Sequence, residues 1–213
     1  MHAQIGGVLF QDDAYLSDFE DFNPAALNAF NEHIDRIVSI EELLPDAAMS
    51  GEWTRFKTQG LMTFTDELIA AVRRHRPGAL FARNIYTRLL TQPESETWFA
   101  QNYDRFLEAY DYTVVMAYPR MEQAEQPVPW LRALADVAGR APDGLTKTIF
   151  KLQAYDWRTD EWIPKSELLK QMQAVLAAGI RHLAYYPDNF RIEKPDLDMI
   201  KLEMSTHSRP GKE

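Results

Sequence analysis

Short apolar runs recur along the chain, and each one is bounded by polar residues. A run of four to eight apolar residues that ends in this way is typical of a strand buried on both faces of a sheet. The pattern therefore predicts five strands, over residues 5–10, 79–85, 112–118, 146–155 and 180–186.

Segments with helical spacing separate these runs. The first such segment begins with acidic residues and ends with basic ones, which suits the helix dipole, and Gly179 is placed to end the last. Residues 45–60 give the weakest pattern, which we interpret as a loop over the sheet. The predicted helices cover residues 65–74, 96–110, 129–138 and 165–178.

The alternation of strands and helices indicates an α/β fold with a parallel sheet of right-handed β-α-β crossovers. A parallel barrel and an open α/β sheet are both compatible with this order of elements. In both architectures, ligands bind at the carboxyl ends of the strands. Residues at the ends of the predicted strands are therefore the first place to look for a functional site.

The composition is that of an ordinary globular chain. Its 213 residues are 46% hydrophobic and 12% aromatic, which is enough for one domain with a sizeable core. No window is long and apolar enough to span a membrane. We expect no signal peptide, because the residues before the first predicted strand lack a basic and then apolar leader. The lack of cysteine excludes disulfides and thiolate chemistry. The net charge of −9 argues against nucleic acid as a partner and favours a neutral or cationic ligand.

The histidines give no sign of a metal centre. They are scattered along the chain without the spacing of metal ligands, so we predict no metal and no other cofactor. These residues are His2, His33, His75, His182 and His207.

An acidic cluster follows the first predicted strand. The apolar residues 8–10 lead into Asp12 and Asp13, and Asp18, Glu20 and Asp21 come soon after. Like charges gathered at a strand end raise some carboxyl pKa values, which is how a fold obtains a protonated acid near neutral pH. One or two acids would suit a loop that merely starts a helix. Five favour an acid/base site.

The other four strand ends combine aromatic rings with hydrogen-bonding side chains. Rings stack on the apolar faces of sugars, while acids and amides bind their hydroxyl groups, so this combination is typical of a sugar-binding cleft. Any single ring at these positions could equally be part of the core or of the packing at its rim. The candidate substrate-binding residues at these ends are Arg83, Asn84, Tyr118, Glu122, Gln153, Trp157, Tyr186 and Asp188.

Five motifs in order carry a family resemblance. They are G-V-L-F-Q-D-D-A-Y-L-S-D-F-E-D, A-R-N-I-Y, V-M-A-Y-P-R-M-E, K-L-Q-A-Y-D-W and Y-Y-P-D-N-F, within residues 6–190. This segment resembles the C-terminal domain of the PgaB family of poly-β-1,6-N-acetylglucosamine (PNAG) N-deacetylases, including its Bordetella-type relatives. The resemblance implies an incomplete (β/α) barrel with an electronegative groove. It also implies binding of partially deacetylated PNAG, a biofilm exopolysaccharide, and its cleavage as an endo-acting glycoside hydrolase.

The resemblance also suggests roles for the acids. The functional acids of the family match Asp13 and Asp21, which we expect to be the catalytic pair. Asp12 and Glu20, which we expect to bind substrate, are the nearest alternatives to this pair. Glycoside hydrolases flank the scissile bond with two carboxyl groups, about 5 Å apart for retention and about 6.5–9.5 Å for inversion. Lys151 stands where a Glu is expected in relatives. The deacetylase domain of the family, with its metal ligands, has no counterpart in this sequence.

The expected fold is thus a partial (β/α) TIM-like barrel of about five β/α units over residues 1–204, followed by a polar tail over 205–213. Since a closed barrel needs about eight strands, we expect the N-terminal strands to be missing and a sheet edge to be exposed. The resemblance places the parent protein, with an N-terminal deacetylase domain, in the periplasm or at the outer membrane.

Two functional hypotheses of different classes remain. The first is an endo-β-1,6-glycosidase, and the second is a non-catalytic carbohydrate-binding module that guides deacetylated PNAG to export. A third interpretation, a structural fragment without a site, does not explain the aromatic and polar residues at the five predicted strand ends.

Overall fold

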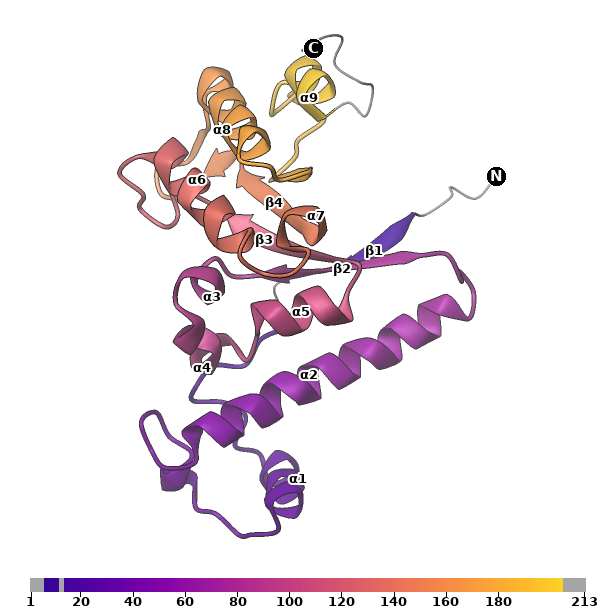
Figure 1. Ribbon diagram of the computed structural model, residues 1–213, viewed down its shortest axis with the longest axis vertical. Helices are drawn as coiled ribbons and strands as arrows, with labels where there is room; N and C mark the ends of the chain where they lie inside the picture. Colours follow the sequence, from indigo (N-terminus) through magenta and orange to yellow (C-terminus); the bar gives the residue numbers. More distant parts are fainter. Residues whose placement is uncertain (1–5, 12–13, 205–213) are drawn as a thin grey trace. The chain divides into compact units, whose positions relative to one another are not determined.

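A five-stranded parallel sheet organises the chain (Figure 1). The computed structural model describes residues 6–11 and 14–204. The sheet has the strand order β1-β2-β3-β4-β7, and helices flank it. This topology confirms the predicted fold class, a partial (β/α) TIM-like barrel. The strands are β1 (Gly7–Phe10), β2 (Leu80–Ile85), β3 (Tyr112–Ala117), β4 (Thr148–Gln153) and β7 (His182–Tyr186).

The chain divides into two compact units, Met1–Thr113 and Val114–Glu213. The single-domain boundary at residue 204 stays a prediction, and the polar tail lies outside the described residues. All five predicted strands are present, each one to four residues shorter than its predicted range. The described part of the chain contains no helix that is both long and apolar enough to cross a membrane.

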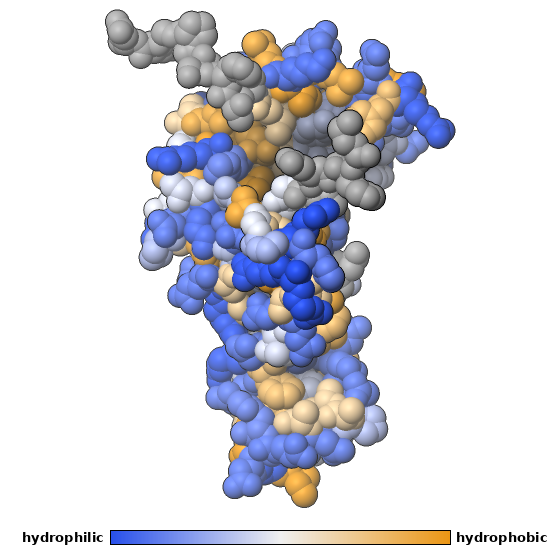
Figure 2. Space-filling model, turned by 90° about the vertical axis from the view of Figure 1, so that its right-hand side faces the viewer, coloured by the Kyte–Doolittle hydropathy of each residue, from blue (hydrophilic) through white to orange (hydrophobic). Residues whose placement is uncertain are grey.

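In the first unit, β1 and β2 pair in parallel, with Gly7 opposite Leu80. A Cβ atom on Gly7 would lie 2.4 Å from the backbone oxygen of Leu80, so the close approach of the strands requires glycine here. β1 is one of the two outer strands of the sheet, and Leu9 on β1 is exposed. Figure 2 shows one face of the molecule, on which such hydrophobic residues are scattered among hydrophilic ones.

This contact gives a prediction for stability. Gly7→Ala should lower the free energy of unfolding by about 1–3 kcal/mol, because backbone atoms must move to admit the methyl group. Gly6→Ala is the matched control, since nothing lies within 4 Å of a Cβ at that position. Urea unfolding followed by circular dichroism measures both, and equal stability of the two variants would contradict the account of Gly7.

The interpretation of residues 45–60 as a loop was wrong, because the 24-residue helix α2 (Ser50–Arg73) begins within them. Trp53 is buried on α2 and packs edge-to-face on Phe30 of α1, with ring centroids 5.0 Å apart. Gly51, Gly60 and several threonines weaken the local helical signal, and tertiary packing overrides it.

Helix α1 (Pro24–Ile34) was not predicted. Asn23 caps it by accepting hydrogen bonds from the backbone of Ala25 and Ala26, and Pro24 occupies the first turn. The single helix predicted over 96–110 is two helices, α4 (Glu96–Phe99) and α5 (Tyr103–Ala109), separated at Ala100 by a left-handed backbone. The first unit also contains η1 (Ile40–Glu42), α3 (Arg88–Thr91) and η2 (Pro93–Ser95).

In the second unit, β4 and β7 pair in parallel, α8 packs on β4, and α6 packs on α8. The predicted helices over 129–138 and 165–178 are confirmed, and Gly179, with φ 96°, follows the end of α8. A two-stranded hairpin follows β4. The elements not yet given are α6 (Pro127–Ala138), α7 (Gly144–Lys147), β5 (Tyr155–Asp156), β6 (Glu161–Trp162), α8 (Lys165–Ala177) and α9 (Leu197–Met204).

Candidate functional site

Within the acidic segment after β1, residues 17–20 form a turn that is closed by its own hydrogen bonds. Asp12 and Asp13 lie outside the described residues. The Glu20 carboxylate accepts a hydrogen bond of 2.8 Å from the backbone N–H of Ser17, and the Glu20 N–H donates to the Ser17 carbonyl. The bond from the Ser17 backbone holds the pKa of Glu20 below its usual value. Glu20 is therefore ionised near neutral pH, opposite to the raised pKa expected somewhere in this cluster.

Asp21 stands directly before α1 and is held by its capping residue. The backbone N–H of Asn23 donates to Asp21 Oδ1 at 3.3 Å, and the Asn23 side-chain amide donates to Oδ2. Because Asn23 in turn caps α1, the helix start and the Asp21 carboxylate are fixed by one residue. Asp21 is half-buried.

Lys57, which the sequence reasoning missed, reaches this turn from α2. Its ammonium donates to the carbonyl oxygens of Ser17 and Glu20, at 2.5 and 2.6 Å, and lies 5.7 Å from the centroid of the Trp53 ring. The residue is only 4% exposed. Burial lowers the pKa of Lys57 to about 8, and the charges of Asp18, Glu20 and Asp21 oppose that shift.

At the end of β2, Arg83 and Asn84 are both fully buried. The Arg83 guanidinium donates to Thr65 Oγ1 at 2.5 Å, Tyr110 Oη at 2.9 Å and the carbonyl of Ala14 at 3.0 Å. Asn84 donates to Gln11 Oε1 at 2.8 Å. These bonds tie the chain after β1 to β2, so both side chains shape the surroundings of the acidic segment. Their direct contact with a substrate stays a prediction.

In the second unit, the ends of three strands bring aromatic rings together. We call Tyr118, Trp157 and Tyr186 the aromatic group. The ring centroid of Trp157 lies 6.0 Å from that of Tyr186, at an interplanar angle of 29°, and 5.8 Å from that of Tyr118. Trp157 and Tyr186 are 45% and 50% exposed, whereas Tyr118 is buried. The two exposed rings therefore leave apolar faces available to a ligand.

Lys151 contacts the same group from β4. Its ammonium lies 5.9 Å from the ring centroid of Tyr118 and 5.6 Å from that of Tyr186, and the residue is 5% exposed. These are cation–π distances. A buried cation thus stands beside the rings at the position where the resemblance leads us to expect an acid.

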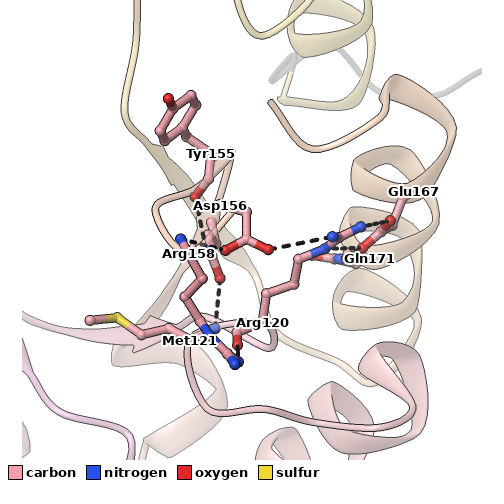
Figure 3. A network of polar contacts seen from close by, with 8 residues as sticks. Arg120, Met121, Tyr155, Asp156, Arg158, Glu167 and Gln171 are labelled. Carbon is pink, nitrogen blue, oxygen red and sulfur yellow. Dashed lines mark hydrogen bonds and ion pairs between the residues drawn. The ribbon is translucent and has the colours of Figure 1, made fainter. Parts of the chain in front are cut away.

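A polar network fixes the hairpin that carries Trp157 (Figure 3). The Arg120 guanidinium binds Glu167 through two hydrogen bonds, of 2.7 and 3.2 Å, and contacts Asp156 at 3.4 Å. The bonds to Glu167 raise the pKa of Arg120 further. Asp156 accepts a bond of 3.0 Å from the backbone of Arg158. The residues on both sides of Trp157 are therefore anchored to this network.

Gln153 belongs to the same network. Its side-chain oxygen Oε1 accepts a hydrogen bond of 3.2 Å from the backbone N–H of Met121. Its side-chain nitrogen Nε2 donates one of 2.8 Å to the backbone carbonyl of Tyr155. Gln153 is almost fully buried. The geometry gives it a role in joining the ends of β3 and β4, and its predicted contact with substrate is untested.

The network gives a second stability prediction. Glu167→Gln should lower the free energy of unfolding by about 0.5–1 kcal/mol, because the ion pair with Arg120 is only partly shielded from solvent. Glu125→Gln, at an exposed acid of the same unit, is the control. Urea unfolding measures both, and a loss no greater in Glu167→Gln than in Glu125→Gln would show that the network contributes little.

The two remaining predicted residues lie beyond β3 and β7. Asp188 is exposed and accepts a hydrogen bond of 3.2 Å from the hydroxyl of Tyr185. Burial, together with this neighbouring charge, raises the pKa of Tyr185. Glu122 is half-buried, and its backbone N–H donates to the carbonyl of Tyr118 in the turn after β3. Among the described residues, no three His, Asp or Glu side chains are grouped as metal ligands.

Comparison with known proteins places this arrangement in a family. The model of a family described as hypothetical glycosyl hydrolase family 13 matches residues 1–186. The chain belongs to this family. As a member of hypothetical glycosyl hydrolase family 13, it is 39% identical over 214 residues to the poly-β-1,6-N-acetyl-D-glucosamine N-deacetylase of Escherichia coli K12, and equally to that of strain O157:H7.

The coverage of these matches is unequal. Each alignment to the Escherichia coli proteins covers 96% of this chain but 31% of the relative, so the chain spans about a third of their length. A solved structure, the PgaB (BpsB) glycoside hydrolase domain from Bordetella bronchiseptica, matches with a TM-score of 0.88 and 35% identity. That match covers 95% of this chain and 57% of the other. The predicted resemblance to the PgaB glycoside hydrolase domain is confirmed.

Proposed function

We propose that this chain binds partially deacetylated PNAG and hydrolyses it as an endo-β-1,6-glycosidase. The observation that carries the proposal is the match to a solved glycoside hydrolase domain over 95% of the chain. The Escherichia coli relatives, 39% identical, are named for their action on poly-β-1,6-N-acetyl-D-glucosamine, which supports the choice of polymer.

The proposed catalytic pair is Asp13 and Asp21. One carboxyl group would protonate the leaving oxygen, while the other would attack the sugar, activate water or support the substrate's own acetamido group. The fixed position of Asp21 before α1 supports its part, since catalytic groups need a held geometry. Ionised Glu20 and, as the sequence predicted, Asp12 would bind the ammonium groups of glucosamine units.

Sugar rings would stack on the aromatic group. Two of its rings are about half exposed, as stacking on the apolar face of a sugar requires. Glu122 and Asp188 are proposed to bind sugar hydroxyl or ammonium groups beside it, as the sequence predicted. Arg83, Asn84 and Gln153 would act mainly by holding the strand ends, given their burial and their protein partners.

A second function, non-catalytic binding that guides deacetylated polymer to export, is favoured by one observation. Lys151 places a cation beside the aromatic group where the resemblance leads us to expect a Glu. If that acid takes part in cleavage in relatives, this chain would keep the rings that bind sugar but lack one of the carboxyl groups needed for hydrolysis. In both functions, the parent protein is proposed to carry a deacetylase domain and to lie in the periplasm or at the outer membrane.

A reducing-end assay tests the proposal. The chain is incubated with PNAG that is fully acetylated, partially deacetylated or fully deacetylated, and new reducing ends are counted over time. Hydrolysis predicts that ends accumulate fastest with the partially deacetylated polymer. Binding of that polymer without new ends would leave the non-catalytic function.

A further inference from the structure

We propose that Lys57 is a positioning residue for the candidate acid Asp21, because its ammonium joins the carbonyls of Ser17 and Glu20 and so holds the turn before Asp21 on α2. The inference rests on the proposed function insofar as Asp21 acts in catalysis. The anchoring of the turn by Lys57 stands on the geometry of the first unit alone.

The contacts are those of an internal anchor. The Nζ atom lies 2.5 Å from the Ser17 oxygen and 2.6 Å from the Glu20 oxygen, and it joins residues 37 to 40 positions apart in the sequence. The same two residues close the turn through their own hydrogen bonds. α2 is a long helix with Trp53 buried one turn before Lys57, so the anchor starts from a rigid element.

Lys57 also stands out in the sequence by its residue type. Lys57 is the only lysine before Lys147, in a segment whose other cations are arginines. A lysine ammonium is a compact charge with three donors that can rotate, which suits two converging carbonyl oxygens. A guanidinium is larger and planar, so Lys57→Arg should keep the positive charge but fit the two carbonyls less closely.

Protonation of Lys57 should control the strength of the anchor. Hydrogen bonds from an ammonium are stronger than those from a neutral amine. Because burial lowers the pKa of Lys57 to about 8, the residue is mostly charged at pH 7 and mostly neutral at pH 9. The charged groups that face it are three acids, Asp18, Glu20 and Asp21. The hold on the turn should therefore weaken as the pH rises through about 8.

The contribution of Lys57 to the free energy of unfolding should change with pH in the direction opposite to its hold on the turn. The pKa of Lys57 in the folded protein lies below the value of about 10.4 in an unfolded chain. Between these values the unfolded state binds more protons, so the contribution of Lys57 to stability rises with pH. A fall in cleavage over pH 8–9 without a matching loss of stability would separate positioning of the turn from general unfolding.

Kinetics of three variants test the positioning role. Lys57→Met should lower kcat for PNAG cleavage at pH 7 about tenfold or more, with a much smaller change in KM, because bound substrate meets a misplaced acid. Lys57→Arg should keep part of the activity and lose the alkaline decline near pH 8, since arginine does not titrate there. Lys170→Met, at an exposed lysine on α8, should behave like the wild type. An alkaline decline that is unchanged in Lys57→Arg would overturn the proposal.

Nuclear magnetic resonance tests the anchor without any cleavage assay. The side-chain resonance of Lys57, identified by its loss in Lys57→Arg, should titrate near pH 8, and the backbone amides of residues 17–21 should shift with the same midpoint. In Lys57→Arg these amides should not titrate there. If the wild type does not cleave PNAG, the proposed function fails, while these shifts still decide whether Lys57 holds the turn. If the shifts of these amides do not change as Lys57 titrates, the anchor is refuted.

Discussion

Asp21→Asn is expected to lower the rate of PNAG cleavage by about 10²–10⁴-fold, the range that removal of one acid/base group typically costs. The amide oxygen of asparagine can still accept the hydrogen bond that the Asn23 backbone N–H gives to Asp21. The start of α1 should therefore survive, and polymer binding should change little. The measurement is the rate of new reducing ends, with Kd for the polymer determined in parallel.

Asp18→Asn is the matched control for this variant. It removes an acid from the same segment, and its cleavage rate should stay within a few-fold of the wild type. Equal rates for Asp21→Asn and the wild type would exclude Asp21 from the catalytic pair and direct attention to Asp12 and Asp13. A large fall in both variants would instead show that the segment acts through its summed charge.

Trp157→Ala should weaken binding of partially deacetylated PNAG about five- to tenfold, because it removes one of the two exposed rings of the aromatic group. Asp156 and Arg158 are held by the network around Arg120, so the hairpin should keep its course. Isothermal calorimetry with short oligosaccharides measures the change in Kd.

The control for this prediction is Trp98→Ala. Trp98 is 39% exposed on α4 in the first unit, and its ring centroid lies 5.8 Å from the guanidinium carbon of Arg88. Its replacement should leave Kd for the oligosaccharides unchanged. Equal affinities of Trp157→Ala and Trp98→Ala would assign the aromatic group to packing, which is the alternative that the sequence left open for each of its rings.

Elements of the fold could be predicted where the sequence within them has a clear hydrophobic pattern. The five strands were predictable because buried parallel strands such as β3 form continuous apolar runs, with Val114 and Val115 almost fully buried. The first half of α2 was not predictable, since Gly51 and Gly60 weaken its helical signal and the packing of Trp53 involves rings outside this helix, such as Phe30 on α1. Such tertiary contacts have no signature within a short window of sequence.

The candidate site divides in the same way. Tyr118, Trp157 and Tyr186 were predictable as neighbours, because the ends of parallel strands meet at one edge of the sheet. Lys57 and Arg83 could not be assigned their roles, since each depends on partners far away in the sequence. For Lys57, the one available signal was its isolation among arginines.

Mass spectrometry of the products formed from partially deacetylated PNAG tests the central claim most directly. The account predicts that the folded wild-type chain converts long polymer into a series of shorter oligosaccharides, and that Asp21→Asn produces almost none while it still binds the polymer. An unchanged distribution of polymer lengths, from a wild-type protein shown to be folded and bound to PNAG, would contradict hydrolysis and leave binding as the function.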